Sequence, residues 1–255
     1  MMNIFIQEFA KQLKTAMGIG QKAQFTNHEH HLQNIVVLGM GGSGIGGDFV
    51  AEFVRDSCSV PFISCKSYEL PAFVGKNSLV IASSYSGNTE ETLASFGQAL
   101  KTGAKIVCLT SGGKLLTNAQ KHQLDVVQIP AVKQPPRSCL GYSFVQVLYI
   151  LKHFGFAPAS FEADLNKAIS TLDQEQSKIQ MIARQAAQKM HQKFSIIYAT
   201  SRMSAVALRL RQQMNENSKL LACHHAYPEM NHNELVGWRE QTGDFAVVNF
   251  RSKDD

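Results

Sequence analysis

The sequence contains 255 residues, of which 44% are hydrophobic and 18% are charged, and its formal net charge is +5. This length allows one large domain or two smaller ones, and the composition is that of an ordinary globular protein. The positive charge is spread along the chain, which argues against nucleic-acid binding. The five scattered cysteines favour a reducing compartment. The sequence has neither a signal-peptide pattern nor an apolar run of transmembrane length, so we expect a cytoplasmic protein that does not contact a membrane.

Residues 1–155 are expected to form a first α/β domain. Short apolar strands alternate with helical patterns, and the strands are predicted at residues 34–38, 61–65, 79–83, 105–110 and 126–129. Near-continuous apolar strands separated by helices indicate a parallel sheet that is covered on both faces. Two prolines at positions 135 and 136 then interrupt the chain, and residues 138–154 predict a helix.

Residues 156–255 are expected to form a connecting helix and a partial second α/β domain. Residues 161–192 contain no glycine or proline and favour a long polar helix. The elements that follow are a strand at 194–200, a helix at 202–214, an apolar run at 220–223 and a strand at 245–251. The fold class is therefore α/β, with parallel sheets flanked by helices.

The most informative segment is SYSGNTEET at residues 84–92, directly after a predicted strand. Hydroxyl side chains, a glycine and free helical N–H groups converge there, which is how a fold binds phosphate. A second glycine-rich turn, GMGGSG at residues 39–44, also follows a strand. Ligands of parallel sheets bind beyond the carboxyl ends of the strands. We therefore expect the two turns to hold one phosphorylated small molecule.

Two other interpretations of these turns are open. GMGGSG also satisfies the dinucleotide pattern GxGxxG, which would suit a nicotinamide-dependent oxidoreductase. The next strand, however, is followed by Lys66, and the first acidic residue, needed to hold a ribose, is Glu69. Ser86, Asn88 or Thr89 is suited to cap a helix, but capping explains one such residue better than a cluster of them.

A second group of polar residues comprises NENSK at 215–219 and PEMNHNE at 228–234. Asparagines on both sides of Glu216 are unusual at a helix C-terminus, because asparagine is a poor helix former. Glu216 alone is also consistent with a solvated acid at a helix end, and His232 with a loop histidine whose hydrogen bonds are satisfied. The residue pattern leaves these alternatives open.

In order along the chain, residues 39–47, 84–92, 136–137, 215–219 and 228–234 resemble the motifs of the bifunctional phosphoglucose/phosphomannose isomerases, members of the SIS (sugar isomerase) superfamily. The resemblance implies two flavodoxin-like SIS domains and interconversion of fructose 6-phosphate with glucose 6-phosphate, mannose 6-phosphate or both. It also implies a place in glycolysis or gluconeogenesis, a homodimer with shared active sites, and no cofactor.

The resemblance also implies roles for individual residues. The residues that would hold the sugar phosphate are Gly42, Ser43, Ser84, Ser86 and Thr89. Arg137 would stabilise the developing enediolate, Glu216 would move a proton between C2 and C1, and His232 of the partner subunit would assist ring opening. These residue types suit aldose–ketose isomerisation, because one base suffices and a guanidinium stays charged beside the enediolate oxygen.

No metal site is expected. The segment HEHH at residues 28–31 has ligand-type side chains, but an exposed polar turn is favoured because a metal site needs closed, oriented ligands. The resemblance further implies an α/β stretch and a C-terminal helix after the strand at 245–251, with a lysine and a threonine for the active site. The sequence given ends at Asp255, so we expect an incomplete second domain. A non-catalytic phosphosugar-binding SIS protein is accordingly the alternative to an isomerase.

Overall fold

The computed structural model describes residues 2–240 and 243–252, and the chain divides into two compact units, Met1–Asp173 and Gln174–Asp255. Each unit has its own sheet. The sequence pattern predicts a domain boundary after residue 155. The units divide later, because helix α7 (Phe161–Gln174) buries Phe161, Leu165 and Ile169 in the core of the first unit.

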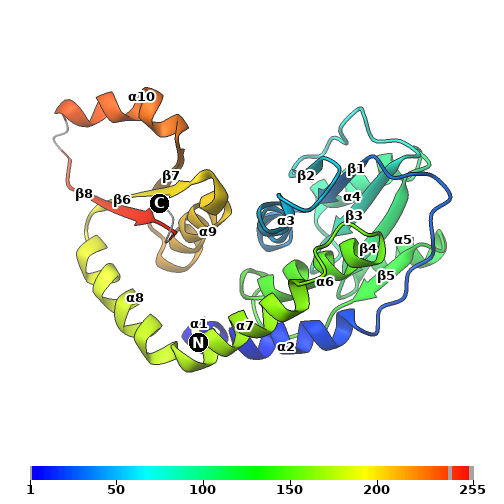
Figure 1. Ribbon diagram of the computed structural model, residues 1–255, viewed down its shortest axis with the longest axis horizontal. Coiled ribbons are helices and arrows are strands. Elements are labelled where there is room, and N and C mark those ends of the chain that lie inside the picture. Colours follow the sequence, from blue (N-terminus) through cyan, green and yellow to red (C-terminus); the bar gives the residue numbers. More distant parts are fainter. Residues whose placement is uncertain (1, 241–242, 253–255) are drawn as a thin grey trace. The chain divides into compact units, whose positions relative to one another are not determined.

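The first unit contains a five-stranded parallel sheet with the strand order β2-β1-β3-β4-β5 (Figure 1). Its strands are β1 (Asn34–Leu38), β2 (Phe62–Cys65), β3 (Ser78–Ser83), β4 (Lys105–Thr110) and β5 (Asp125–Gln128). This is the flavodoxin-like order, in which the connections diverge between β1 and β3. The prediction of a parallel sheet is confirmed, and no strand end differs from its expected position by more than 1 residue.

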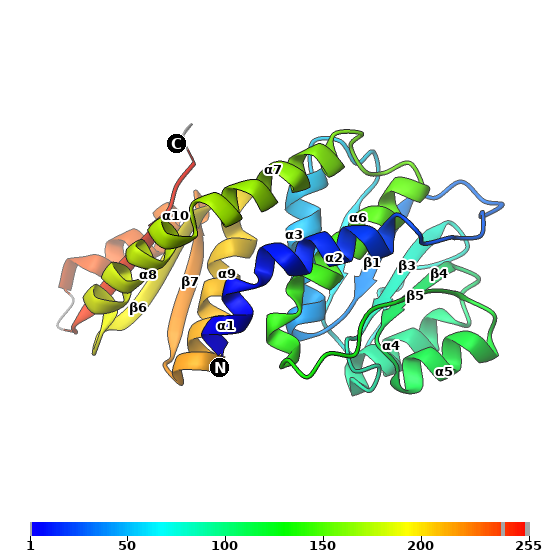
Figure 2. The same ribbon diagram turned by 90° about the horizontal axis from the view of Figure 1, so that it is seen from below.

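Helices cover both faces of this sheet (Figure 2). The covering helices are α2 (Phe9–Gly20), α3 (Gly41–Val54), α4 (Glu90–Ala99), α5 (Gly113–Lys121), α6 (Leu140–His153) and α7, and α1 (Met2–Gln7) precedes α2 without burying a residue. Side chains alternate along β1: Ile35 and Val37 pack with α2, α3, α6 and α7, whereas Val36 and Leu38 pack with α4 and α5. The near-continuous apolar strands therefore reflect burial on both faces.

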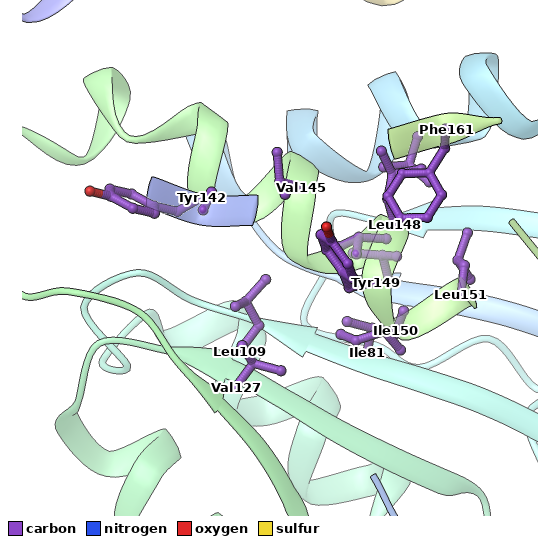
Figure 3. Packing of buried hydrophobic residues seen from close by; sticks show 14 of the residues in the cluster. Ile81, Leu109, Val127, Tyr142, Val145, Leu148, Tyr149, Ile150, Leu151 and Phe161 are labelled. Atoms are coloured by element: carbon purple, nitrogen blue, oxygen red, sulfur yellow. The ribbon is translucent and has the colours of Figure 1, made fainter. Parts of the chain in front are cut away.

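Helix α6 is the centre of the larger cluster (Figure 3). Every residue from 145 to 151 is buried, because α6 lies between the sheet and the helices α2 and α3. A glutamine from α2 fixes its beginning: Gln12 Oε1 accepts the N–H of Gly141 at 2.7 Å, and Gln12 Nε2 donates to the carbonyl of Ser138 at 2.9 Å. These two bonds hold the short 3₁₀ turn Pro136–Ser138 in front of α6.

The second unit contains a three-stranded parallel sheet with the order β7-β6-β8. Its strands are β6 (Phe194–Thr200), β7 (Ala222–Tyr227) and β8 (Phe245–Phe250), and its helices are α8 (Gln176–Met190), α9 (Ser204–Gln213) and α10 (Glu229–Gly237). Short 3₁₀ turns at Ser201–Met203 and Trp238–Glu240 and a π-helix at Met214–Ser218 complete it. Among the described residues no helix has the length and hydrophobicity needed to cross a membrane.

Three features of the second half differ from the expectations. The long helix predicted at 161–192 is two helices, α7 and α8, which belong to different units. The apolar run 220–223 contains only the first two residues of β7: Leu220 and Leu221 are exposed and precede the strand, and its pairing with β6 extends to Tyr227. The segment PEMNHNE begins a helix, α10, that the sequence pattern did not predict.

Candidate active site

Two turns meet at the carboxyl ends of β1 and β3: residues 39–44, the first turn, and residues 84–89, the second turn. They are joined directly, because Ser43 Oγ accepts the N–H of Tyr85 at 3.2 Å. Strands β1 and β3 are neighbours, and ligands of sheets with this order bind where the connections diverge. The expectation that the two turns lie together is confirmed.

Hydroxyl groups organise the second turn. Ser84 is 1% exposed, and its Oγ lies 2.9 Å from Thr89 Oγ1 and accepts the N–H of Gly87 at 3.1 Å. Ser86 is exposed, and its Oγ accepts the N–H of Asn88 at 3.2 Å. Thr89 is the N-cap residue of α4 but makes no side-chain capping bond. The hydroxyl cluster therefore shapes the turn and does not cap the helix, which leaves the amino end of α4 suited to an anion.

A third turn, residues 111–113 after β4, supports the second turn and was not among the predicted site residues. Ser111 donates to the carbonyl of Tyr85 from both its N–H, at 3.0 Å, and its Oγ, at 2.7 Å. The N–H of Leu115 donates to the carbonyl of Gly87 at 2.9 Å. The signal in the sequence was Ser-Gly-Gly directly after a buried strand, in the same position as the other two turns.

Two glycines allow the turns to approach other backbone closely. Gly87 has a φ of 68°, and a Cβ there would lie 1.8 Å from the carbonyl oxygen of Gly112. A Cβ on Gly42 would lie 3.1 Å from the carbonyl oxygen of Pro136. Gly42 therefore brings the first turn against the 3₁₀ turn that carries Arg137.

Arg137 is half-buried in the 3₁₀ turn Pro136–Ser138. The segment leading to it is held by Tyr85, whose hydroxyl donates to the carbonyl of Pro130 at 3.0 Å and accepts the N–H of Val132 at 2.9 Å. Burial raises the pKa of Tyr85 to about 12, so the hydroxyl keeps the proton that it donates. The first unit thus gathers Gly42, Ser43, Ser84, Ser86, Thr89 and Arg137 around one edge of its sheet.

Glu216 lies in the second unit, in the π-helix Met214–Ser218 that follows α9. Its side chain is exposed, and its backbone carbonyl accepts a hydrogen bond from Nζ of Lys219 at 2.7 Å. Lys219 ends the helix with a left-handed φ of 58°. Burial lowers the pKa of the neighbouring Arg209, and the charge of Glu216 opposes that effect. Glu216 therefore lies in a one-turn π-helix, a local structure that occurs frequently at functional sites.

His232 is an exposed residue of helix α10. The alternative of a loop histidine is therefore wrong. The candidate residues are divided between the two units: the phosphate-binding candidates and Arg137 are in the first, and Glu216 and His232 are in the second.

Comparison with known proteins agrees with the sequence motifs. A bifunctional phosphoglucose/phosphomannose isomerase from Caldicellulosiruptor bescii is 38% identical over 239 residues, which cover 91% of this chain and 70% of that protein. The protein with the same name from Thermoplasma acidophilum is 33% identical over 262 residues, with 100% and 78% coverage. The chain belongs to the bifunctional phosphoglucose/phosphomannose isomerase family.

Two further comparisons concern the fold of this phosphoglucose/phosphomannose isomerase family member. Residues 179–255 match a profile described as the bacterial phospho-glucose isomerase C-terminal SIS domain. The C-terminal domain of glucosamine-fructose-6-phosphate aminotransferase from Francisella tularensis superposes with a TM-score of 0.68 at 15% identity, covering 96% of this chain and 75% of that one. At this identity the likeness concerns the fold alone.

The environment of β2 in this isomerase family member does not resemble a dinucleotide site. Lys66, after β2, forms an ion pair with Asp48 of α3, so a cation and not a ribose-binding acid stands next to the first turn. In the histidine-rich segment 28–31, His28 Nε2 lies 2.7 Å from the carbonyl of Lys76, which is distant in the sequence. Among the described residues no group of three or more His, Cys, Asp or Glu side chains is arranged to hold a metal ion.

Proposed function

We propose that this chain is an aldose–ketose isomerase that interconverts fructose 6-phosphate with glucose 6-phosphate, mannose 6-phosphate or both through an enediolate. One observation carries the proposal: in a chain of this family, the turns at residues 39–44 and 84–89 are hydrogen-bonded to each other at the carboxyl edge of a flavodoxin-like sheet. That edge is where such sheets bind phosphorylated ligands.

The phosphate group is assigned to the two turns. Its oxygens accept hydrogen bonds from the hydroxyls of Ser43, Ser84, Ser86 and Thr89 and from backbone N–H groups such as that of Gly42. The positive end of the α4 dipole adds to this interaction. Neutral donors and a helix dipole are sufficient for such a site, and no lysine is needed in it.

Glu216 is assigned as the base that takes the proton from C2 and returns it to C1, or the reverse. A single carboxylate can perform both steps, because the proton leaves and returns on the same face of the enediolate. Arg137 is assigned to the enediolate oxygen. Its guanidinium stays protonated throughout the reaction and offers fixed donors where the negative charge develops. This chemistry requires no cofactor.

His232 is assigned to ring opening, in which a proton is moved between the ring oxygen and the anomeric hydroxyl. We propose that it acts at the site of the partner subunit in a homodimer, which agrees with its exposed position on α10. Sugar-phosphate isomerisation of this kind belongs to glycolysis and gluconeogenesis, and the five scattered cysteines suit the cytoplasm.

The decisive experiment is an isomerase assay on fructose 6-phosphate that follows glucose 6-phosphate and mannose 6-phosphate separately. The chain is expected to form at least one of them. Replacing Glu216→Gln should abolish hydrogen exchange at C2 with solvent, because an amide cannot accept the proton, while the affinity for the sugar phosphate changes less than about threefold.

Two outcomes would contradict the proposal. Retained exchange at C2 in the Glu216→Gln variant would remove Glu216 from its role. Tight binding of sugar phosphate without product formation by the unaltered chain would instead support the alternative, a non-catalytic phosphosugar-binding SIS protein.

A further inference from the structure

Helix α10, which carries His232, is not held on the second unit by an apolar stripe. Met230 is its one buried residue, whereas Leu235 and Val236 are 54% and 60% exposed. A helix of 9 residues is too short to be stable by itself. Other contacts must therefore fix its position.

Polar side chains line one face of the sheet in this unit. Ile197 and Ala199 of β6 belong to the apolar cluster on the α9 side, so Tyr198 between them faces the opposite side. The parallel register pairs Tyr198 with His225 of β7 and with Asn249 of β8. Paired residues of neighbouring strands share a face, so these three polar residues form a row across the sheet.

Two hydrogen bonds connect α10 and the turn after it to this row. His225 Nδ1 and Glu234 Oε2 lie 3.1 Å apart. Trp238, directly after the helix, donates from Nε1 to the hydroxyl of Tyr198 at 3.0 Å. Tyr198 is 2% exposed, and burial is the main cause that raises the pKa of its hydroxyl. The hydroxyl therefore stays neutral and remains an acceptor for the indole N–H. Figure 1 shows α10 above the strands of this sheet.

His232 and Glu234 lie on opposite sides of the helix. Successive residues of an α-helix are about 100° apart, so two residues separated by two positions point about 200° apart. The exposure agrees, because Glu234 is partly buried and His232 is exposed. A contact that holds Glu234 against the sheet therefore directs His232 away from it.

We propose that Glu234, His225 and Trp238 are positioning residues that orient His232 for ring opening. This inference rests on the proposed function, in which His232 assists that step. The bond between Glu234 and His225 fixes the rotation of α10 about its axis, and the bond between Trp238 and Tyr198 fixes its C-terminal end. None of these residues needs to touch the substrate.

The test measures ring opening alone. Opening and reclosing the pyranose ring interconverts the α and β anomers of glucose 6-phosphate without any proton transfer at C2. Anomer exchange is therefore followed by NMR in the full chain with Glu216→Gln, which blocks isomerisation, after subtraction of the spontaneous rate. Adding Glu234→Ala is expected to lower the catalysed rate at least tenfold, while the affinity for glucose 6-phosphate changes less than threefold.

Matched variants separate positioning from other effects. Glu234→Gln keeps a hydrogen-bonding side chain opposite His225 and should retain at least a third of the rate. Glu240→Ala removes an exposed acid from the following 3₁₀ turn and should leave the rate unchanged. Combining His232→Asn with Glu234→Ala should give no further loss beyond His232→Asn alone, because both act through the same imidazole. Trp238→Phe keeps an aromatic ring, removes the N–H donor, and should also slow exchange.

The contacts of Glu234 and Trp238 with the sheet can also be tested without catalysis. Amide hydrogen exchange in residues 229–237 should become at least tenfold faster in Glu234→Ala and in Trp238→Phe, while exchange in β6 stays the same. Equal rates of anomer exchange in the Glu234→Ala and Glu240→Ala chains would overturn this inference and leave the proposed function standing. A parent chain that catalyses no ring opening would overturn the role of His232 in the proposed function and this inference together.

Discussion

Ser84 and Ser86 show that two hydroxyls of one turn can have different tasks. Ser84 is 1% exposed and bonded to Thr89 and Gly87, so it holds the turn in shape. Ser86 is exposed and makes one bond, to the N–H of Asn88. Ser84→Ala would change both folding and binding, whereas Ser86 allows binding to be tested with little effect on the fold.

We therefore predict that Ser86→Ala weakens glucose 6-phosphate binding about tenfold, because a hydrogen bond to a charged group contributes about 1.5–3 kcal/mol. The unfolding free energy should change by less than about 0.5 kcal/mol. Calorimetric titration gives the first quantity and urea denaturation the second. The control is Thr117→Ala, an exposed hydroxyl on α5, which should leave the affinity unchanged. An equal loss of affinity in both variants would contradict the assignment of Ser86.

Gly87 provides a stricter test of the turn geometry. Its φ is 68°, and a Cβ would meet the carbonyl oxygen of Gly112 at 1.8 Å. Gly87→Ala must therefore distort the second or the third turn, and we expect a loss of unfolding free energy of more than about 1 kcal/mol together with weaker phosphosugar binding.

Gly97→Ala is the matched control for this substitution. Gly97 lies within α4, and a Cβ there has no atom within 4 Å. Alanine is favoured over glycine in a helix by about 1 kcal/mol, so this variant should be as stable as the parent or more so. Chemical denaturation of both chains measures the difference. A Gly87→Ala chain that matches Gly97→Ala in stability and binding would show that the turn tolerates a side chain.

At the scale of elements, the sequence predicts best where burial is simple. The boundaries of β1, β4 and β6 agree with the structure because each is a mainly apolar run between polar turns. Strand β7 lacks such a run, because it carries His224, His225 and Tyr227. Those side chains lie on a polar or half-buried sheet edge, and hydrogen bonding to β6 defines the strand.

Helix α10 was not predictable from periodicity for a related reason. Its sequence EMNHNELVG contains two asparagines and buries one residue, so it lacks the apolar face by which amphipathic helices are recognised. Its contacts with the sheet are made by Glu234, to His225 of β7, and by Trp238 just after the helix, to Tyr198 of β6. The candidate residues in the two turns could be predicted from the sequence, because each turn places glycine and hydroxyl residues directly after a strand. The supporting role of residues 111–113 could not, because it depends on contacts between turns.

Helix α7 is a case in which the structure assigns an element to a different unit than the sequence suggested. Phe161 is 1% exposed and packs edge-on against Tyr149 of α6, with ring centroids 5.1 Å apart (Figure 3). We predict that Phe161→Ala lowers the unfolding free energy of the first unit by about 3–5 kcal/mol. Phe73→Ala, at a position that is 50% exposed, should cost less than about 0.5 kcal/mol. Equal melting temperatures for the two variants would show that α7 is not part of this core.

At the scale of the whole molecule, the candidate residues are divided between the two units. The first unit holds the three turns and Arg137, and its core includes α7 up to residue 172. The proposed base Glu216 and the ring-opening residue His232 both belong to the second unit. Each unit has its own sheet and its own hydrophobic cluster, so phosphate binding by the first unit is expected to be separable from proton transfer by Glu216 when the chain is cut.

We predict that residues 1–173 alone fold cooperatively and bind glucose 6-phosphate within about tenfold of the affinity of the full chain, because every assigned phosphate ligand is retained. The fragment should show neither isomerisation nor hydrogen exchange at C2, since it lacks the carboxylate that moves the proton. Thermal unfolding, calorimetric titration and exchange followed by NMR measure these three properties, with Ser86→Ala in the fragment as the binding control. Exchange catalysed by the fragment would place the base in the first unit and exclude Glu216. Loss of binding in a folded fragment would instead mean that the second unit supplies part of the phosphate site.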